Sequence, residues 1–274
     1  MIECYLANNF WLAKYKPTIF LFIQLLIYDI IELIKLKERK MFKKRYLLKL
    51  SGEALSGNKG FGFSEDVVME VAKQVKELIR GGAQISIVIG GGNFWRGRSS
   101  ETIDRTKADQ IGMMATVMNC IYVSEIFRHI GLKTSIYTPF AIGSFTELFL
   151  KEKAIEDMKN NKVVFFAGGT GHPYFSTDTT TTLRAIEIEA DEILLAKAID
   201  GVYDSDPKTN PNAKRYDKIS ITEVVKNQLK VMDLTATILL FDNPIQIRVF
   251  DLREENSIVN SLNDDFNGTL VTIE

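Results

Sequence analysis

Short apolar runs of β type alternate with longer amphipathic runs at helical spacing throughout residues 41–274. This alternation is typical of βαβ units, so we predict an α/β fold with a largely parallel central sheet. The apolar runs have few polar interruptions, as expected for strands covered on both faces. The predicted strands are 46–50, 85–89, 134–137, 163–166, 192–195, 246–250 and 269–273. The predicted helices begin after Ser64, span about 106–130 and 151–160, and begin near Asp178.

Glycine follows three of the predicted strands directly: Gly52, Gly90–Gly92 and Gly168–Gly171. In open α/β sheets, ligands bind beyond the carboxyl ends of the strands. Glycine in such a turn lets backbone N–H groups approach phosphate oxygens, because no Cβ stands in the way. One such turn could be structural only, but three together predict a site for several phosphates.

Basic side chains occur at the same predicted strand ends. Lys49 lies inside an otherwise apolar strand, Arg96 follows the triple glycine, and Lys197 lies just after the strand at 192–195. A lysine within an apolar strand is costly unless it faces an anion or reaches solvent. Phosphoryl transfer needs cations of this kind to position and neutralise the transferred group.

Several other functional classes lack support in the sequence. There is no G-x-x-x-x-G-K-[ST] motif, and no G-x-G-x-x-G follows the first strand. The only histidines, His129 and His172, have no Ser or Cys nucleophile motif beside them. The net charge is −1, which is unlike the basic surface of a nucleic-acid-binding protein. Two distant cysteines, Cys4 and Cys120, predict neither a disulfide framework nor a zinc site, so we expect a cytoplasmic protein.

Four segments, in order, resemble the signatures of bacterial uridylate kinases. The first is Lys49–Leu55 followed by Gly60-Phe61-Gly62, and the second is Val88–Gly97. The third is Ala167–Asp178, and the fourth is Asp200–Pro207. The resemblance extends from about Lys44 to the C-terminus. It implies the amino-acid-kinase fold, a three-layer αβα sandwich, and transfer of the γ-phosphoryl group of ATP to UMP.

The resemblance also implies roles for individual residues. The expected catalytic residues are Lys49, Arg96 and Asp178. The expected ATP-binding residues are Lys49, Leu50, Ser51, Gly52, Gly92, Arg96, Lys197, Tyr203 and Asp206. The expected UMP-binding residues are Gly91, Asp109, Thr170, Gly171, His172, Pro173, Tyr174, Phe175, Ser176 and Thr177. The segment linked to GTP activation is Gly57, Asn58, Lys59, Gly60, Phe61 and Gly62.

The resemblance further implies Mg²⁺ with ATP, a homohexamer, GTP activation and UTP inhibition, with no protein ligand assigned to a metal. His172 stands where many relatives have Asn, and Ser176 where many have Thr. Leu195–Ala198 follows one subgroup of the family only, which leaves the role of Lys197 open. A sister kinase that acts on a small acid such as acetylglutamate, and a non-catalytic uridylate sensor, are the alternative hypotheses.

Residues 1–40 differ in character from the rest, which we interpret as a single kinase domain over 41–274. The apolar stretch Ile19–Tyr28 is short for a membrane span, and a charge run, Lys35–Lys40, follows it. Three interpretations stay open: translation that starts at Met41, an additional N-terminal helix, and a membrane anchor. We expect no membrane association.

Overall fold

The computed structural model describes residues 44–95 and 102–273. The chain divides into two units, residues 1–43 and 44–274, and only the second is described. The predicted boundary at residue 40 therefore stays a prediction. Arg96, and the N-terminal segment with Cys4, lie outside the described residues.

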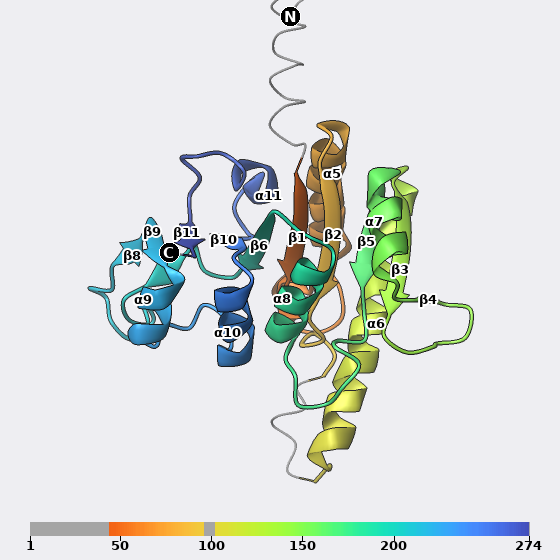
Figure 1. Ribbon diagram of the computed structural model, residues 1–274, viewed down its shortest axis with the longest axis horizontal. Helices are drawn as coiled ribbons and strands as arrows, with labels where there is room; N and C mark the ends of the chain where they lie inside the picture. Colours follow the sequence, from red (N-terminus) through yellow and green to blue (C-terminus); the bar gives the residue numbers. More distant parts are fainter. Residues whose placement is uncertain (1–43, 96–101, 274) are drawn as a thin grey trace, which may run out of the picture. The chain divides into compact units, whose positions relative to one another are not determined.

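A nine-stranded sheet forms the centre of this unit, with strand order β4-β3-β5-β2-β1-β6-β10-β11-β9 (Figure 1). All neighbouring strands are parallel except β10 and β11, which confirms the predicted largely parallel sheet. The strands of this sheet are β1 (Arg45–Leu50), β2 (Gln84–Ile89), β3 (Lys133–Thr138), β4 (Glu147–Leu148), β5 (Lys162–Phe166), β6 (Glu192–Lys197), β9 (Lys218–Ser220), β10 (Gln246–Asp251) and β11 (Thr269–Thr272). A separate antiparallel pair consists of β7 (Val202–Tyr203) and β8 (Arg215–Tyr216).

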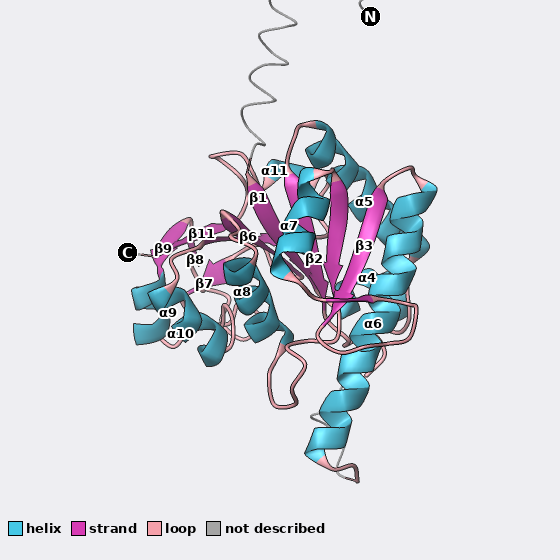
Figure 2. Ribbon diagram, turned by 45° about the vertical axis from the view of Figure 1, so that its right-hand side comes forward, coloured by secondary structure: helices cyan, strands magenta, loops and turns pink. Residues whose placement is uncertain are grey.

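Helices cover both faces of the sheet, as the three-layer αβα sandwich requires (Figure 2). On one face lie α5 (Glu65–Arg80), α6 (Arg105–His129) and α11 (Ser257–Asn260). On the other face lie α7 (Lys151–Lys159), α8 (Thr177–Glu187), α9 (Ile221–Lys226) and α10 (Leu234–Asp242). The short helices α4 (Gly52–Leu55) and η1 (Gly57–Lys59) follow β1.

The two faces of β1 supply two hydrophobic cores, because successive side chains of a strand point to opposite faces. Leu47 belongs to the core beneath α7 and α8, together with Val164 of β5 and Ala185 of α8. On the opposite face, Val68, Val71, Ala72, Val75 and Leu78 of α5 are fully buried at helical spacing. Lys49 shares the face of Leu47, so its side chain points toward α8.

Most predicted elements match the structure to within one or two residues. Ser64 occupies the N-cap position of α5 as expected, but its side chain makes no capping hydrogen bond. The turn at Gly81-Gly82 ends this helix, with Gly82 in the left-handed region at φ 95°. The elements between Gly201 and Asn243 were not predicted, because their runs are short and only weakly periodic.

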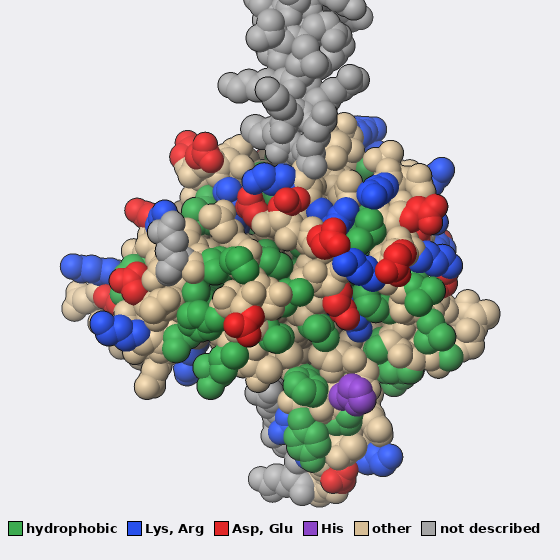
Figure 3. Space-filling view, in the orientation of Figure 1, with side chains coloured by type: hydrophobic (Ala, Val, Ile, Leu, Met, Phe, Trp, Pro, Cys, Tyr) green, Lys and Arg blue, Asp and Glu red, His purple; other side chains and the backbone are tan. Residues whose placement is uncertain are grey.

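Charged side chains of both signs are interspersed over the described surface in Figure 3, and hydrophobic side chains gather over α10. Within the described parts of the chain, no helix is both long enough and apolar enough to cross a membrane.

Candidate active site

The glycine turns meet because β5, β2, β1 and β6 are consecutive neighbours in the sheet. These four strands are parallel, so their carboxyl ends share one edge. Gly168–Gly171 follows β5, Gly90–Gly92 follows β2, Gly52 follows β1, and Lys197 ends β6. The expected gathering of glycine and lysine at one sheet edge is therefore present.

Two cavities open at this edge, and Lys49 lines both of them. The first cavity, of about 350 Å³, lies between the Gly91 turn, α6 and the start of α8. The second cavity, of about 660 Å³, lies between the end of β6, the segment 203–208 and the segment 227–231. One cation thus stands on the wall that the two cavities share.

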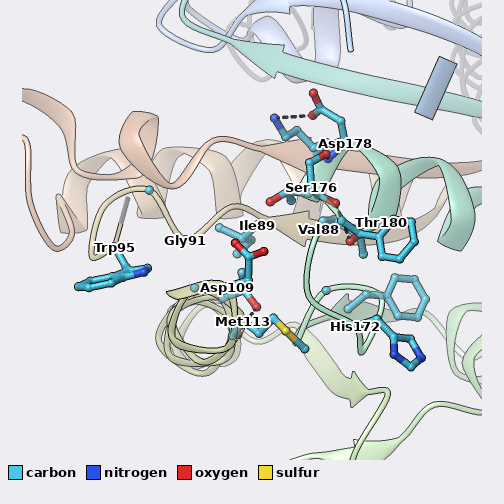
Figure 4. Close-up of a pocket in the computed structure, with 18 of the residues that line it drawn as sticks. Val88, Ile89, Gly91, Trp95, Asp109, Met113, His172, Ser176, Asp178 and Thr180 are labelled. Carbon is cyan, nitrogen blue, oxygen red and sulfur yellow. Dashed lines mark hydrogen bonds and ion pairs between the residues drawn. The ribbon is translucent and has the colours of Figure 1, made fainter. Parts of the chain in front are cut away.

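Lys49 forms an ion pair with Asp178, with 3.1 Å between Nζ and Oδ1 (Figure 4). The two side chains are only 14% and 23% exposed, so the pair is less screened than a surface salt bridge. The contact is not aligned as a hydrogen bond, and among the described residues Asp178 Oδ1 is the buried side-chain oxygen that lacks one. Asp178 therefore holds the ammonium group in place through its charge.

The end of β1 and the turn after β2 are in close backbone contact. A Cβ on Gly52 would lie 2.3 Å from Gly90 O, so no other residue fits there. Behind the turn, Asn93 and Asn119 exchange two side-chain hydrogen bonds of 3.0 and 2.8 Å. Asn119 also donates to Gly90 O at 2.7 Å. Sequence reasoning missed this buried amide pair, which fixes the shape of the glycine turn.

The loop after β5 needs glycine for its backbone conformation. Gly168, Gly169 and Gly171 have φ of 78°, 65° and 93°, in the left-handed region. The N–H of Gly168 donates to Thr116 Oγ1 at 2.8 Å, which ties this loop to α6. The loop thereby lies across the first cavity, with His172 on its wall.

Asp109 joins α6 to the same loop. Its Oδ2 accepts hydrogen bonds from Arg105 Nε at 2.9 Å and from the backbone N–H of Tyr174 at 2.8 Å. Figure 4 shows Asp109 and Met113 on α6 opposite Ser176, Asp178 and Thr180. A carboxylate in this position suits a ligand that carries hydroxyl or N–H donors.

The start of α8 is capped by Ser176, whose Oγ accepts from the N–H groups of Asp178 and Thr179. The proton of the Ser176 hydroxyl is donated to Asp233, the N-cap residue of α10. Burial alone would raise the pKa of Asp233, but hydrogen bonds from Ser176, Ala236 N–H and Thr179 outweigh it and hold the pKa below its ordinary value. Asp233 was not among the predicted residues, and no local motif marks it.

The second cavity contains a half-buried cation and an acidic rim. Lys197 donates to the backbone carbonyl of Val231, and its pKa is lowered chiefly by burial. Tyr203 donates its hydroxyl to Asp200 at 2.8 Å. Asp206 accepts from the N–H of Lys208 at 2.9 Å, which closes the turn at 206–208. An anionic ligand in this cavity would stabilise the charged form of Lys197.

The predicted residues are distributed over both cavities. Those that line the first cavity are Lys49, Gly91, Gly92, Asp109, His172, Phe175, Ser176, Thr177 and Asp178. Those that line the second are Lys49, Ser51, Lys197, Tyr203 and Asp206. Six predicted residues are sequence neighbours of the lining residues but line neither cavity themselves: Leu50, Gly52, Thr170, Gly171, Pro173 and Tyr174. Gly92, which was predicted to bind ATP phosphates, lines the first cavity together with Gly91.

The segment Gly57–Gly62 contacts the glycine turn through Asn93. The N–H of Gly62 donates to Asn93 O at 3.1 Å, and Asn93 Nδ2 donates to Gly62 O at 2.9 Å. Phe61 is 65% exposed and packs edge-on against Phe94. The segment is therefore hydrogen-bonded directly to the turn that lines the first cavity.

The sequence of residues 44–251 matches the family model described as "Amino acid kinase family". The chain belongs to the amino acid kinase family. Among solved structures, a UMP kinase from Bacillus anthracis is 34% identical, with a TM-score of 0.80 over 84% of this chain and 96% of that one. A UMP kinase from Ureaplasma parvum gives the same identity and TM-score over 98% of its length. A uridylate kinase from Archaeoglobus fulgidus is 26% identical, with a TM-score of 0.65. The fold predicted from the sequence is thus confirmed as that of an amino acid kinase.

Proposed function

We propose that this protein is a UMP kinase that transfers the γ-phosphoryl group of ATP to the phosphate of UMP, giving UDP and ADP. The observation that carries the proposal is the position of Lys49 on the wall shared by the two cavities. A transferred phosphoryl group must pass between a donor site and an acceptor site, and a cation at that point offsets its charge. The likeness to UMP kinases over nearly their full length supports the same substrates.

We assign UMP to the first cavity and ATP to the second. Asp109 and the loop after β5 suit the hydroxyl and N–H donors of a nucleoside, while the N–H groups of the Gly91 turn suit a phosphate. Lys197, Tyr203 and Asp206 line a larger cavity that suits the donor nucleotide. Arg96, expected at the phosphates, lies outside the described residues.

The proposed reaction is direct in-line attack by a phosphate oxygen of UMP on the γ-phosphorus of ATP. The attacking oxygen is already ionised at neutral pH, so the step needs no general base. Lys49 offsets the charge of the transferred group, and Asp178 keeps the Lys49 ammonium oriented. The glycine turns hold the reacting groups in line, which reduces the entropic part of the barrier.

The described residues fit Mg²⁺ that is bound mainly by nucleotide. They contain no cluster of three or more His, Cys, Asp or Glu side chains able to hold a metal ion. Mg²⁺ commonly takes one or two carboxylates and completes its octahedron with phosphates and water. Asp178, which lines the first cavity beside Lys49, is the carboxylate placed to contribute. When bound, Mg²⁺ would neutralise phosphate charge.

The proposal includes self-association and regulation by nucleotides. An apolar stripe on α6 is 40–49% exposed and consists of Ile111, Met114, Met118 and Ile121. An exposed stripe of this kind supports contact with a second copy of the chain. The homohexamer, GTP activation and UTP inhibition are inferred from the family resemblance. The link from Gly62 through Asn93 to the glycine turn supports a regulatory role for 57–62. Cytoplasmic location rests on cysteine usage alone.

The test is release of ADP from Mg-ATP with UMP, CMP, dTMP and acetylglutamate as acceptors. We expect turnover with UMP well above the others. Acetylglutamate turnover would favour the sister kinase, and UMP binding without turnover would favour the sensor.

A variant pair tests the role of Lys49. Lys49→Ala should lower kcat by about 10²–10³-fold, the range for losing one preorganised donor. Lys44→Ala is the matched control, because Lys44 also pairs with an acid, Glu192 at 2.9 Å, but precedes the opposite end of β1. We expect normal turnover from the control. Near-normal kcat in Lys49→Ala would refute the assigned role.

A further inference from the structure

Asp233 connects the N-termini of two helices. Its carboxylate accepts hydrogen bonds from Ser176 Oγ and from Thr179 Oγ1, both at the start of α8. The same carboxylate accepts from the N–H of Ala236 at 2.9 Å, which caps its own helix, α10. The helices α8 and α10 pack directly against each other, so this junction is internal to one layer.

The direction of these hydrogen bonds is determined by counting donors and acceptors. Ser176 Oγ already accepts from Asp178 N at 3.0 Å and Thr179 N at 3.2 Å, which uses both of its lone pairs. Its single proton then has one partner, Asp233. The opposite side of the carboxylate faces the N–H of Ala236, so both of its oxygens must accept. Of side chains of this size, only an ionised Asp satisfies every contact.

The same segment reaches the second cavity. Residues 227–231 line that cavity, and the carbonyl of Val231 accepts a hydrogen bond from the half-buried Lys197. Asp233 follows two residues later. One continuous stretch of backbone therefore contacts the cation of the second cavity and the helix start that carries Thr177 and Asp178 of the first.

We propose that Asp233 is a positioning residue that holds the start of α8 in register with the wall of the donor cavity. The inference rests on the proposed function, which assigns UMP to the first cavity and ATP to the second. Asp233 lines neither cavity and acts through Ser176. Loss of its carboxylate displaces Asp178, the partner of Lys49, relative to the donor.

The test compares Asp233→Asn with Thr237→Val. In Asp233→Asn, an amide NH₂ must face either Ser176 Oγ, which has no free lone pair, or the N–H of Ala236. Thr237 is buried on the same helix and donates to the backbone carbonyl of Asp233 at 2.9 Å. Thr237→Val therefore removes a local hydrogen bond of α10 and keeps the hydrogen bonds from Asp233 to α8, so it controls for loss of stability.

Three quantities are measured for wild type and both variants: kcat and KM for each substrate, the thermal midpoint, and hydrogen exchange of the Asp178 and Thr179 amides. Asp233→Asn should lower kcat by up to about 100-fold, as for a small misplacement of reacting groups. KM for ATP should stay near its wild-type value, because the contact to Lys197 uses the backbone of Val231. Exchange at Asp178 and Thr179 should accelerate. Thr237→Val should change only the thermal midpoint.

Normal kcat in Asp233→Asn, with a lowered thermal midpoint alone, would overturn the proposal and leave Asp233 a merely structural residue. Unchanged exchange at Asp178 and Thr179 would overturn it as well. Absence of UMP turnover in the wild type would instead reject the proposed function. The exchange measurement would still decide whether Asp233 holds the start of α8, so the two failures are distinguishable.

Discussion

Replacing Gly52 by Ala tests the close contact between the ends of β1 and β2. The new Cβ would lie 2.3 Å from Gly90 O, 2.6 Å from Asn93 Oδ1 and 3.1 Å from Gly90 C. Two of these atoms belong to the backbone, so a side-chain rotation cannot relieve the contact. Gly90 itself is held by a hydrogen bond from its N–H to Leu50 O at 3.0 Å and by the bond from Asn119 to its carbonyl. The turn can yield only by lengthening these bonds.

The expected cost follows from opposing contributions. Overpacking of a tight site costs about 1–3 kcal/mol. Weakening a buried hydrogen bond adds about 1 kcal/mol. Ala has a higher helix propensity than Gly, so this substitution in the first turn of α4 stabilises the folded state by at most about 1 kcal/mol. We therefore expect a net loss of about 2 kcal/mol in the free energy of unfolding, which lowers the thermal midpoint by about 4–8 °C for a domain of this size.

The assay is thermal unfolding at one fixed protein concentration, because self-association would make the midpoint concentration-dependent. Gly112→Ala is the matched control. Gly112 lies inside α6, and the nearest atom to its Cβ would be Trp95 Cδ1 at 3.6 Å, an ordinary van der Waals distance. Helix propensity predicts that this variant is as stable as wild type or more stable, by up to about 1 kcal/mol. A Gly52→Ala protein with an unchanged or raised midpoint would refute the described contact between the two turns.

Two further predictions concern acid stability and self-association. Burial tends to raise the pKa of Asp157, but hydrogen bonds from Lys162, Ser135 and Tyr137 hold the pKa below the ordinary 3.8. Asp157 therefore binds a proton less readily in the folded state than in the unfolded state. The ionised Asp157 carboxylate thus contributes to the free energy of unfolding above pH 3.8, and this contribution is lost as the pH falls through the folded pKa. Asp157→Asn should flatten the decline in unfolding free energy below pH 3.8, measured by urea titration, and an unchanged decline would contradict this origin. Met118→Glu, in the exposed stripe of α6, should lower the assembly mass in light scattering. The control Lys226→Glu, an exposed residue on α9, should not. Equal masses for the two variants would argue against α6 as the contact.

The sequence alone determined the elements that depend on local chemistry. Alternation of apolar strands with amphipathic helices predicted the parallel α/β sheet, because strand and helix periodicities are read over a few residues. Lys49 was identified as a site residue, because a cation in an apolar strand requires a partner. The glycines after β1, β2 and β5 were also identified, because a strand end followed by glycine is a local signal in the sequence.

Only the tertiary structure decided how these parts meet. The order β5-β2-β1-β6 gathers the glycine turns, and strand order depends on pairing between segments far apart in the chain. Asp233 lies 57 residues from Ser176, and the carbonyl of Val231 lies 34 residues from Lys197. Neither contact has a sequence pattern, because a hydrogen bond between distant segments needs only one donor and one acceptor brought together by packing. For the same reason the structure, and not the motif, placed Lys49 on the wall between two cavities.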